Sequence, residues 1–226
     1  MPKYVVVTTF RTGSTLLCDV ISKEKNVTNH GEFFYNKIND HLIAQSNLPV
    51  LTKEYQSRIA YLRASNNWVT KIITTPLFSG REIIDSSCTP IFLYRKNIVE
   101  QFKSEINMAY RYMLLGAPRS TFTKDTPPIE YDIIDVPPKN INNGVLAFVR
   151  KLEVWYLLYN IYKDRAITLS YEDNIKNFDL TKLGITNNSS DQIQTPYNCT
   201  NLKDNDWQYY VDFLSNYKYY TDIEPG

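Results

Sequence analysis

Cysteine and histidine are scarce in this sequence. The three cysteines are Cys18, Cys88 and Cys199, and the two histidines are His30 and His41. The cysteines are odd in number and widely spaced, and they form neither a CxxC pair nor a metal-ligand pattern with the histidines. These features argue against a disulfide framework and against a zinc site. They favour a reducing compartment.

An excess of charge of either sign is lacking too, and so is a long apolar run at the start. Lysine and arginine number 25, aspartate and glutamate 24, and the net charge is +1. This balance gives no global electrostatic case for a nucleic acid or an acidic membrane surface as partner. The opening MPKYVVVTTF lacks the apolar stretch of a signal peptide or anchor. We therefore expect a cytoplasmic protein with no membrane span and no nucleic-acid partner.

Strand and helix patterns alternate along the chain. Runs such as YVVVTT are typical of buried parallel strands, and apolar residues at helical spacing follow Asn97, which we expect to cap a long helix. The alternation predicts a single α/β domain over 1–226, with three layers and a parallel sheet flanked by helices. The predicted strands cover 4–9, 68–73, 90–94 and 166–171, and the predicted helices cover 14–23, 53–64, 97–113, 142–163 and 207–220.

A proline-rich stretch over 116–141 separates two of the predicted helices. It contains five prolines and no helical or strand pattern. Loops of this length inside a compact domain are usually functional or disordered. We interpret it as a lid or acceptor-binding loop, and the alternative is a mobile surface connection.

The loop over 11–15, with the sequence RTGST, joins the first predicted strand to the first predicted helix. This arrangement suits an anion, because Gly13 allows close backbone approach and the N–H groups and dipole of the helix face the ligand. Ser14 and Thr15 add hydroxyl donors, and Arg11 adds charge. The loop is not a Walker A motif, since GxxxxGK[ST] is absent. The alternative for RTGST alone is a capped strand–helix turn with a surface arginine.

Four blocks of sequence, in order, resemble PAPS-dependent sulfotransferases, in particular the bacterial trehalose (glycolipid-type) family. PAPS is 3′-phosphoadenosine 5′-phosphosulfate. The blocks are the 11–15 loop followed by Glu32 in GEFF, WVTKI at 68–72, FLYR through Ser104, and the stretch from Trp155 through LSYEDN. Departures are Phe10, where many members have proline, and the short chain between 36 and 68. Trehalose is therefore not carried over as the acceptor.

The resemblance implies a P-loop-NTPase-like sulfotransferase fold and a role for each matched residue. The loop residues Arg11, Thr12, Gly13, Ser14 and Thr15 would hold the 5′-phosphosulfate, and Arg11 would also stabilise the leaving group. Outside the loop, Arg95 and Ser104 would hold the 3′-phosphate. The donor would be PAPS, the nucleotide product PAP (the desulfated donor), and no metal would be required.

The catalytic base is expected to be a carboxylate. The resemblance places it at Glu32, and two adjacent phenylalanines suggest a partly apolar wall that would make it a stronger base. His30 is the rival base, since imidazole suits proton transfer near neutrality. Lys71 could contact the sulfonate or the acceptor, or extend its stem as a structural lysine.

The acceptor and the alternatives remain open at this level. We expect a hydroxyl on a small molecule, glycan or glycolipid, and a homodimer is left open. One alternative function is a P-loop kinase acting on a small molecule, which the missing Walker lysine weakens. The other is a non-catalytic nucleotide-binding module. The aromatic residues Trp155, Tyr156 and Tyr159 have the spacing of a buried helix face, and we assign them to the core.

Overall fold

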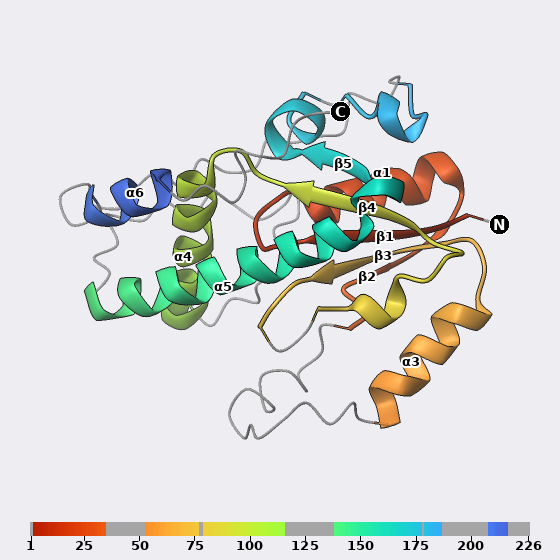
Figure 1. The fold of residues 1–226 in the computed structure, drawn as a ribbon, viewed down its shortest axis with the longest axis horizontal. Helices are drawn as coiled ribbons and strands as arrows, with labels where there is room; N and C mark the ends of the chain where they lie inside the picture. The colour runs from red at the N-terminus through yellow and green to blue at the C-terminus, as the bar shows by residue number, and fades with distance from the viewer. Residues whose placement is uncertain are drawn as a thin grey trace.

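The structure is a computed structural model that describes residues 2–34, 53–76, 79–115, 138–177, 179–186 and 208–216. Its centre is a five-stranded sheet in the order β2-β3-β1-β4-β5, and every neighbouring pair is parallel (Figure 1). The strands are β1 (Lys3–Thr8), β2 (Thr28–Gly31), β3 (Trp68–Ile73), β4 (Thr89–Tyr94) and β5 (Ile167–Ser170).

Helices connect the strands. The α-helices are α1 (Ser14–Lys25), α3 (Lys53–Ala64), α4 (Ile98–Leu115), α5 (Pro138–Tyr162) and α6 (Gln208–Ser215). Short 3₁₀ turns lie at Arg81–Ile83, Lys163–Arg165 and Thr181–Leu183, and one π-helical turn lies at Tyr171–Ile175. None of the described helices is long and apolar enough to cross a membrane.

Capping residues fix the helix ends near the sheet. The helix α1 ends at Asn26, whose left-handed conformation lets Val27 N–H donate to Ser22 O at 3.0 Å. At the start of α4, the Asn97 side chain accepts from Glu100 N–H at 3.0 Å, so the predicted cap is confirmed.

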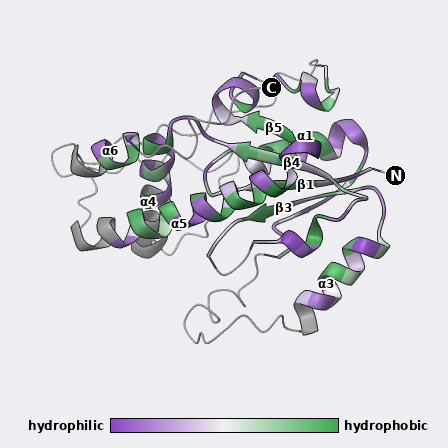
Figure 2. Ribbon diagram, in the orientation of Figure 1, coloured by the Kyte–Doolittle hydropathy of each residue, from purple (hydrophilic) through white to green (hydrophobic). Residues whose placement is uncertain are grey.

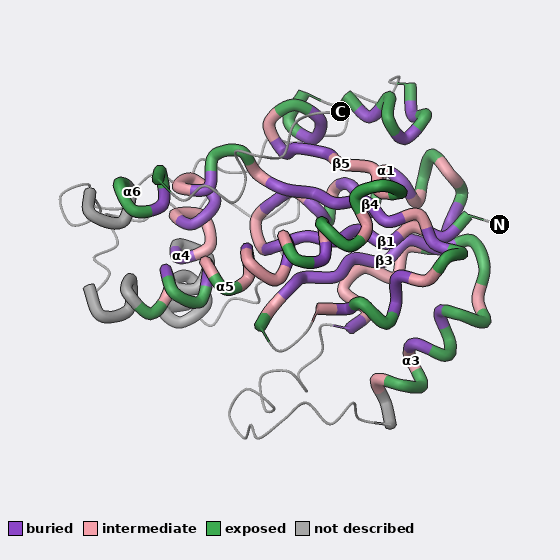
Figure 3. The backbone as a smooth tube through the Cα atoms, in the orientation of Figure 1, coloured by how far each residue is buried: buried purple, intermediate pink, exposed green. Residues whose placement is uncertain are grey.

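Both faces of the sheet are buried, as apolar strands of a parallel sheet require. Val5, Val6 and Val7 of β1 are fully buried, and β4 is hydrophobic and buried along most of its length (Figures 2 and 3). On one face, the sheet packs against residues of α3, α4 and α5. On the other face, it packs against α1 and the segment that follows β5. The predicted α/β class with helices on both faces is confirmed.

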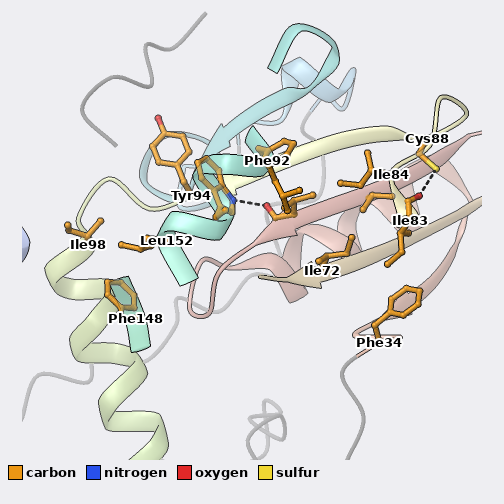
Figure 4. Close-up of a cluster of buried hydrophobic side chains, with 14 of the residues drawn as sticks. Phe34, Ile72, Ile83, Ile84, Cys88, Phe92, Tyr94, Ile98, Phe148 and Leu152 are labelled. Carbon is orange, nitrogen blue, oxygen red and sulfur yellow. Dashed lines mark hydrogen bonds between the residues drawn. The ribbon is translucent and has the colours of Figure 1, made fainter. Parts of the chain in front are cut away.

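The larger core cluster is rich in aromatic rings (Figure 4). Trp155 of α5 is fully buried, and its indole N–H donates to Val7 O at 3.1 Å, which joins α5 to the central strand. Its ring lies 5.5 Å from that of Phe92 and stacks on Tyr159. Near the far end of the cluster, Cys88 Sγ lies 3.7 Å from Ile83 O. The expectation that the aromatic residues of α5 belong to the core is therefore confirmed.

The predicted elements are present, with two main differences. The strand β2 was not predicted, because TNHG has neither apolar alternation nor a β-branched run. The helix α5 begins at Pro138 and not at 142, so the end of the predicted 116–141 loop is helical. Proline is well suited to a first helical turn, because no intrahelical N–H is needed there. The rest of the predicted lid, 116–137, lies outside the described residues.

Candidate functional site

The candidate site is at the edge of the sheet where all five strands end. Because the strands are parallel, the loops at 9–13, 32–34, 95–97 and 171–175 leave from this one edge. The strand β1 is central in the strand order, and its loop leads directly into α1 (Figure 1). In open α/β sheets, ligands bind at this carboxyl edge.

The loop after β1, residues 9–13, has an unusual backbone. Arg11 has φ +62° and Gly13 has φ +80°, both in the left-handed region. A Cβ at Gly13 would lie 2.9 Å from Ile175 Cγ2 and 3.0 Å from Tyr171 Cδ2, so the turn after β5 presses against the loop. Gly13 is also the N-cap of α1 and offers no side chain to its first N–H groups. These features suit an approaching anion.

Hydrogen bonds brace this loop from within the core. Thr12 is fully buried, and its hydroxyl pairs with the Thr8 hydroxyl and contacts Thr9 O at 3.3 Å. Gln101 of α4 is fully buried, and its amide donates to Thr9 Oγ1 and to Phe10 O at 2.6 Å each. The Thr12 side chain therefore faces the interior, and any ligand contact from Thr12 would use its backbone. Gln101 was not predicted as part of the site.

Arg11 meets Ser104, 93 residues away in the sequence. Arg11 Nε donates to Ser104 Oγ at 2.9 Å, and both side chains are partly buried. The contact joins the loop after β1 to the second turn of α4. The two predicted ligand residues are thus brought to one place.

Arg95 follows β4 and packs on the turn after β5. Its guanidinium lies 4.6 Å above the Tyr171 ring, and Nε lies 3.4 Å from Glu172 Oε1. This is an ion-pair distance, but Nε is buried and has no hydrogen-bond acceptor. The Glu172 carboxylate also accepts from the N–H groups of Lys96 and Asn97, at 2.8 and 3.2 Å, and so holds the segment between β4 and α4.

Tyr171 links the two arginines. Burial raises the pKa of its phenol above the ordinary value, and the charges of Arg95 and Arg11 act in the opposite direction. The same ring packs on Gly13. Arg11, Arg95 and Ser104 are therefore grouped around the loop after β1. The position of Tyr171 between them depends on the strand order, which sequence spacing does not predict.

Glu32 lies just after β2 and is ion-paired. Its Oε1 is 2.7 Å from Lys71 Nζ, and Lys71 Nζ also donates to Thr15 Oγ1 at 2.6 Å. The Lys71 side chain is only 6% exposed and that of Glu32 is 36% exposed. The sequence predicts a partly apolar wall beside Glu32, but the structure places the Lys71 ammonium against the carboxylate. Phe34 is buried in the core, and Phe33 packs with other aromatic rings.

The surroundings of His30 are aromatic. Its ring is 5.2 Å from that of Phe33 and 5.7 Å from that of Tyr61. Burial against this aromatic group lowers the pKa of the imidazole. His30 thus has an environment that favours the neutral imidazole, and its ring packs against Phe33 and Tyr61.

A second ion pair, unforeseen from the sequence, joins α4 to α5. Lys151 pairs with Glu105, and its Nζ lies 4.6 Å from the centre of the Phe10 ring. Glu105 Oε2 is buried without a hydrogen-bond partner, as is Oε1 of Gln101 one turn earlier. Residues 46 positions apart cannot be paired from sequence spacing alone.

The described residues contain no group of three or more histidine, cysteine, aspartate and glutamate side chains that could hold a metal ion. Neither a known protein-family model nor a curated protein sequence matches the chain.

Proposed function

We propose that this chain is a sulfotransferase that moves a sulfuryl group from PAPS to a hydroxyl of a small or carbohydrate-like acceptor. The observation that carries the proposal is the hydrogen bond from Arg11 Nε to Ser104 Oγ, at 2.9 Å. It joins a residue proposed for the 5′ end of the donor to one proposed for the 3′-phosphate.

The loop at 9–13 suits the 5′-phosphosulfate. In this proposed phosphate loop, Gly13 keeps a left-handed backbone without a side chain at the N-cap of α1, Thr15 is exposed on the first turn of α1, and Arg11 supplies charge. Backbone N–H groups and a helix N-terminus together favour an anion. Ser14, which is buried at the start of α1, contributes its backbone in this proposal.

Arg95 and Ser104 suit the 3′-phosphate. Arg95 Nε is buried with no hydrogen-bond acceptor, which is costly unless a ligand supplies one. The guanidinium is held in place by the Tyr171 ring and by Glu172. An arginine fixed in this way presents a planar donor set that matches phosphate oxygens.

In the proposed reaction, Glu32 takes the proton of the acceptor hydroxyl as its oxygen bonds to sulfur. The bond from sulfur to the phosphate oxygen breaks on the opposite side. Arg11 faces the phosphate oxygen that gains negative charge, and such preorganised charge lowers the barrier. General-base catalysis of this kind is typically worth about 10²–10⁴-fold in rate.

A P-loop kinase remains the alternative to be tested. Lys71 reaches the first turn of α1 from β3, so an ammonium is present near the loop even though the Walker lysine is absent. The proposed sulfotransferase fold, with its P-loop-like strand, loop and helix, is shared by both activities. The nucleotide that binds distinguishes them.

The test of the proposal is a transfer screen with sulfate-labelled PAPS over sugars, glycolipids, phenols and small alcohols. We expect label to enter a hydroxyl-bearing acceptor, with no requirement for a divalent metal. A parallel screen uses ATP with magnesium and the same acceptors. Transfer of phosphate from ATP, without any transfer of sulfate from PAPS, would show that the protein is a kinase and not a sulfotransferase.

A further inference from the structure

Lys71 is a buried cation with two partners of different kinds. It lies near the middle of β3, with its side chain only 6% exposed. A buried ammonium is stable only when it is paired and hydrogen-bonded. Lys71 Nζ meets both needs, at 2.7 Å from Glu32 Oε1 and 2.6 Å from Thr15 Oγ1.

The sheet brings these partners together. Lys71 pairs in register with Val6 of β1, and its neighbour Thr70 pairs with Gly31 at the end of β2. The Thr70 hydroxyl donates to Gly31 O at 3.0 Å, which fixes the chain just before Glu32. Lys71 therefore joins the proposed base directly to the first turn of the helix that follows the phosphate loop.

The Lys71 ammonium cannot form equally close contacts with two anions at the same time. In the pair seen here, the ammonium faces the carboxylate that the proposed reaction needs as a base. A sulfonate at the N-terminus of α1 would lie at the same turn as Thr15 and would compete for that ammonium. Two anions near one cation repel each other, so closer contact with one weakens contact with the other.

We propose that Lys71 exchanges Glu32 for the sulfonate when the complete donor binds, and that this exchange frees Glu32 to act as the base. The inference rests on the proposed function. PAP has no sulfonate and leaves the Lys71–Glu32 pair in place. Lys71 is then a positioning residue that makes the base available only when a sulfuryl group is ready to be transferred.

The test is a comparison of PAP and PAPS binding, without acceptor, in the wild type, Glu32→Gln, Lys71→Met and the double variant. Loss of a charge-assisted contact predicts that Lys71→Met lowers PAPS affinity about tenfold or more, with PAP affinity nearly unchanged. Glu32→Gln is expected to raise PAPS affinity several-fold relative to PAP, because the ammonium no longer has to leave a carboxylate. This gain disappears in the double variant.

A lysine away from the site provides the control. Lys25 donates to Gly184 O at 3.1 Å, and Lys25→Met is expected to change neither affinity. An unchanged PAPS-to-PAP ratio in Glu32→Gln would overturn the exchange and leave the proposed function intact. Wild-type protein that binds neither nucleotide would overturn both. The ratio of PAPS to PAP affinity in Glu32→Gln tests the exchange even if Lys71→Met does not fold.

Discussion

Gly13 is the point at which the proposed phosphate loop, α1 and the turn after β5 meet. Its φ of +80° disfavours a side chain, and a Cβ would lie 2.9 Å from Ile175 Cγ2. We expect Gly13→Ala to lower the free energy of unfolding by roughly 2–4 kcal/mol, from left-handed strain and overpacking together. Urea denaturation measures the loss.

Gly184→Ala is the matched control for this substitution. Gly184 has a similar φ of +62°, but the one atom near its Cβ position is Lys25 Nζ, at an ordinary contact distance of 3.5 Å. Only the strain of about 1–2 kcal/mol is expected here. Equal losses in the two variants would show that the contact with Ile175 and Tyr171 adds nothing to the stability of the loop.

Arg95 is the residue that we expect to recognise the 3′-phosphate. Arg95→Ala should weaken PAP binding about tenfold to a hundredfold, the usual worth of a charge-assisted hydrogen bond. Binding of adenosine 5′-phosphate, which lacks the 3′-phosphate, should hardly change. Calorimetric titration of both nucleotides checks this. The control is Glu172→Gln, which removes the ion partner and keeps the guanidinium, and it should retain the preference for PAP. Equal losses of affinity for both nucleotides in Arg95→Ala would show that Arg95 supports the fold and does not recognise the 3′-phosphate.

Glu32 and His30 are rival bases two residues apart, in different surroundings. Glu32→Gln keeps the shape and removes the basicity, so turnover with PAPS should fall about 10²–10⁴-fold. PAP affinity should stay near the wild-type value. His30→Asn should cost much less, because the ring packs on Phe33 and Tyr61. Reversed losses of turnover in the two variants would make His30 the base.

At the scale of elements, α4 braces the loop after β1 through Gln101 as well as through Ser104. Gln101 donates to Thr9 Oγ1 and Phe10 O from a fully buried position. We expect Gln101→Met to cost about 1–3 kcal/mol of stability, because buried acceptors lose their donor. Lys103→Ala on the same helix removes only the Lys103–Glu100 pair and should cost about 0.2–0.5 kcal/mol. Similar thermal unfolding of the two variants would contradict this role of α4.

Elements with a strong local pattern could be predicted from the sequence. Continuous apolar runs located β3 and β4 because both strands are buried on two faces. The edge strand β2 escaped prediction because its residues are polar, and its strand conformation depends on pairing with β3. The start of α5 at Pro138 cannot be predicted from the sequence, because proline occurs both in loops and in the first turn of helices.

The candidate site could be predicted only in part. The loop at 11–15 carries its own pattern of glycine, hydroxyls and arginine, and so it could be recognised locally. The Lys71–Glu32 pair, the Gln101 contacts and the packing of Tyr171 on Gly13 could not. Each of these contacts joins residues distant in sequence, and only the strand order brings them together.

At the scale of the whole molecule, the parallel sheet places every proposed functional group at one edge. The loop after β1 lies centrally, with Glu32 and Lys71 toward the β2 side and Arg95 and Tyr171 toward the β5 side. A donor with phosphate groups at two positions would therefore span the centre of the sheet. The central claim is that this edge binds a nucleotide carrying a 3′-phosphate.

The most direct measurement of that claim is the melting temperature of the protein with and without PAP. A ligand at about 100 times its dissociation constant stabilises the folded state by about 2.7 kcal/mol. For a chain of this size, that corresponds to a rise of roughly 5–10 °C. We predict such a rise with PAP, and a much smaller one with adenosine 5′-phosphate at the same concentration. No rise with saturating PAP, alongside a clear rise with ATP and magnesium, would contradict the account.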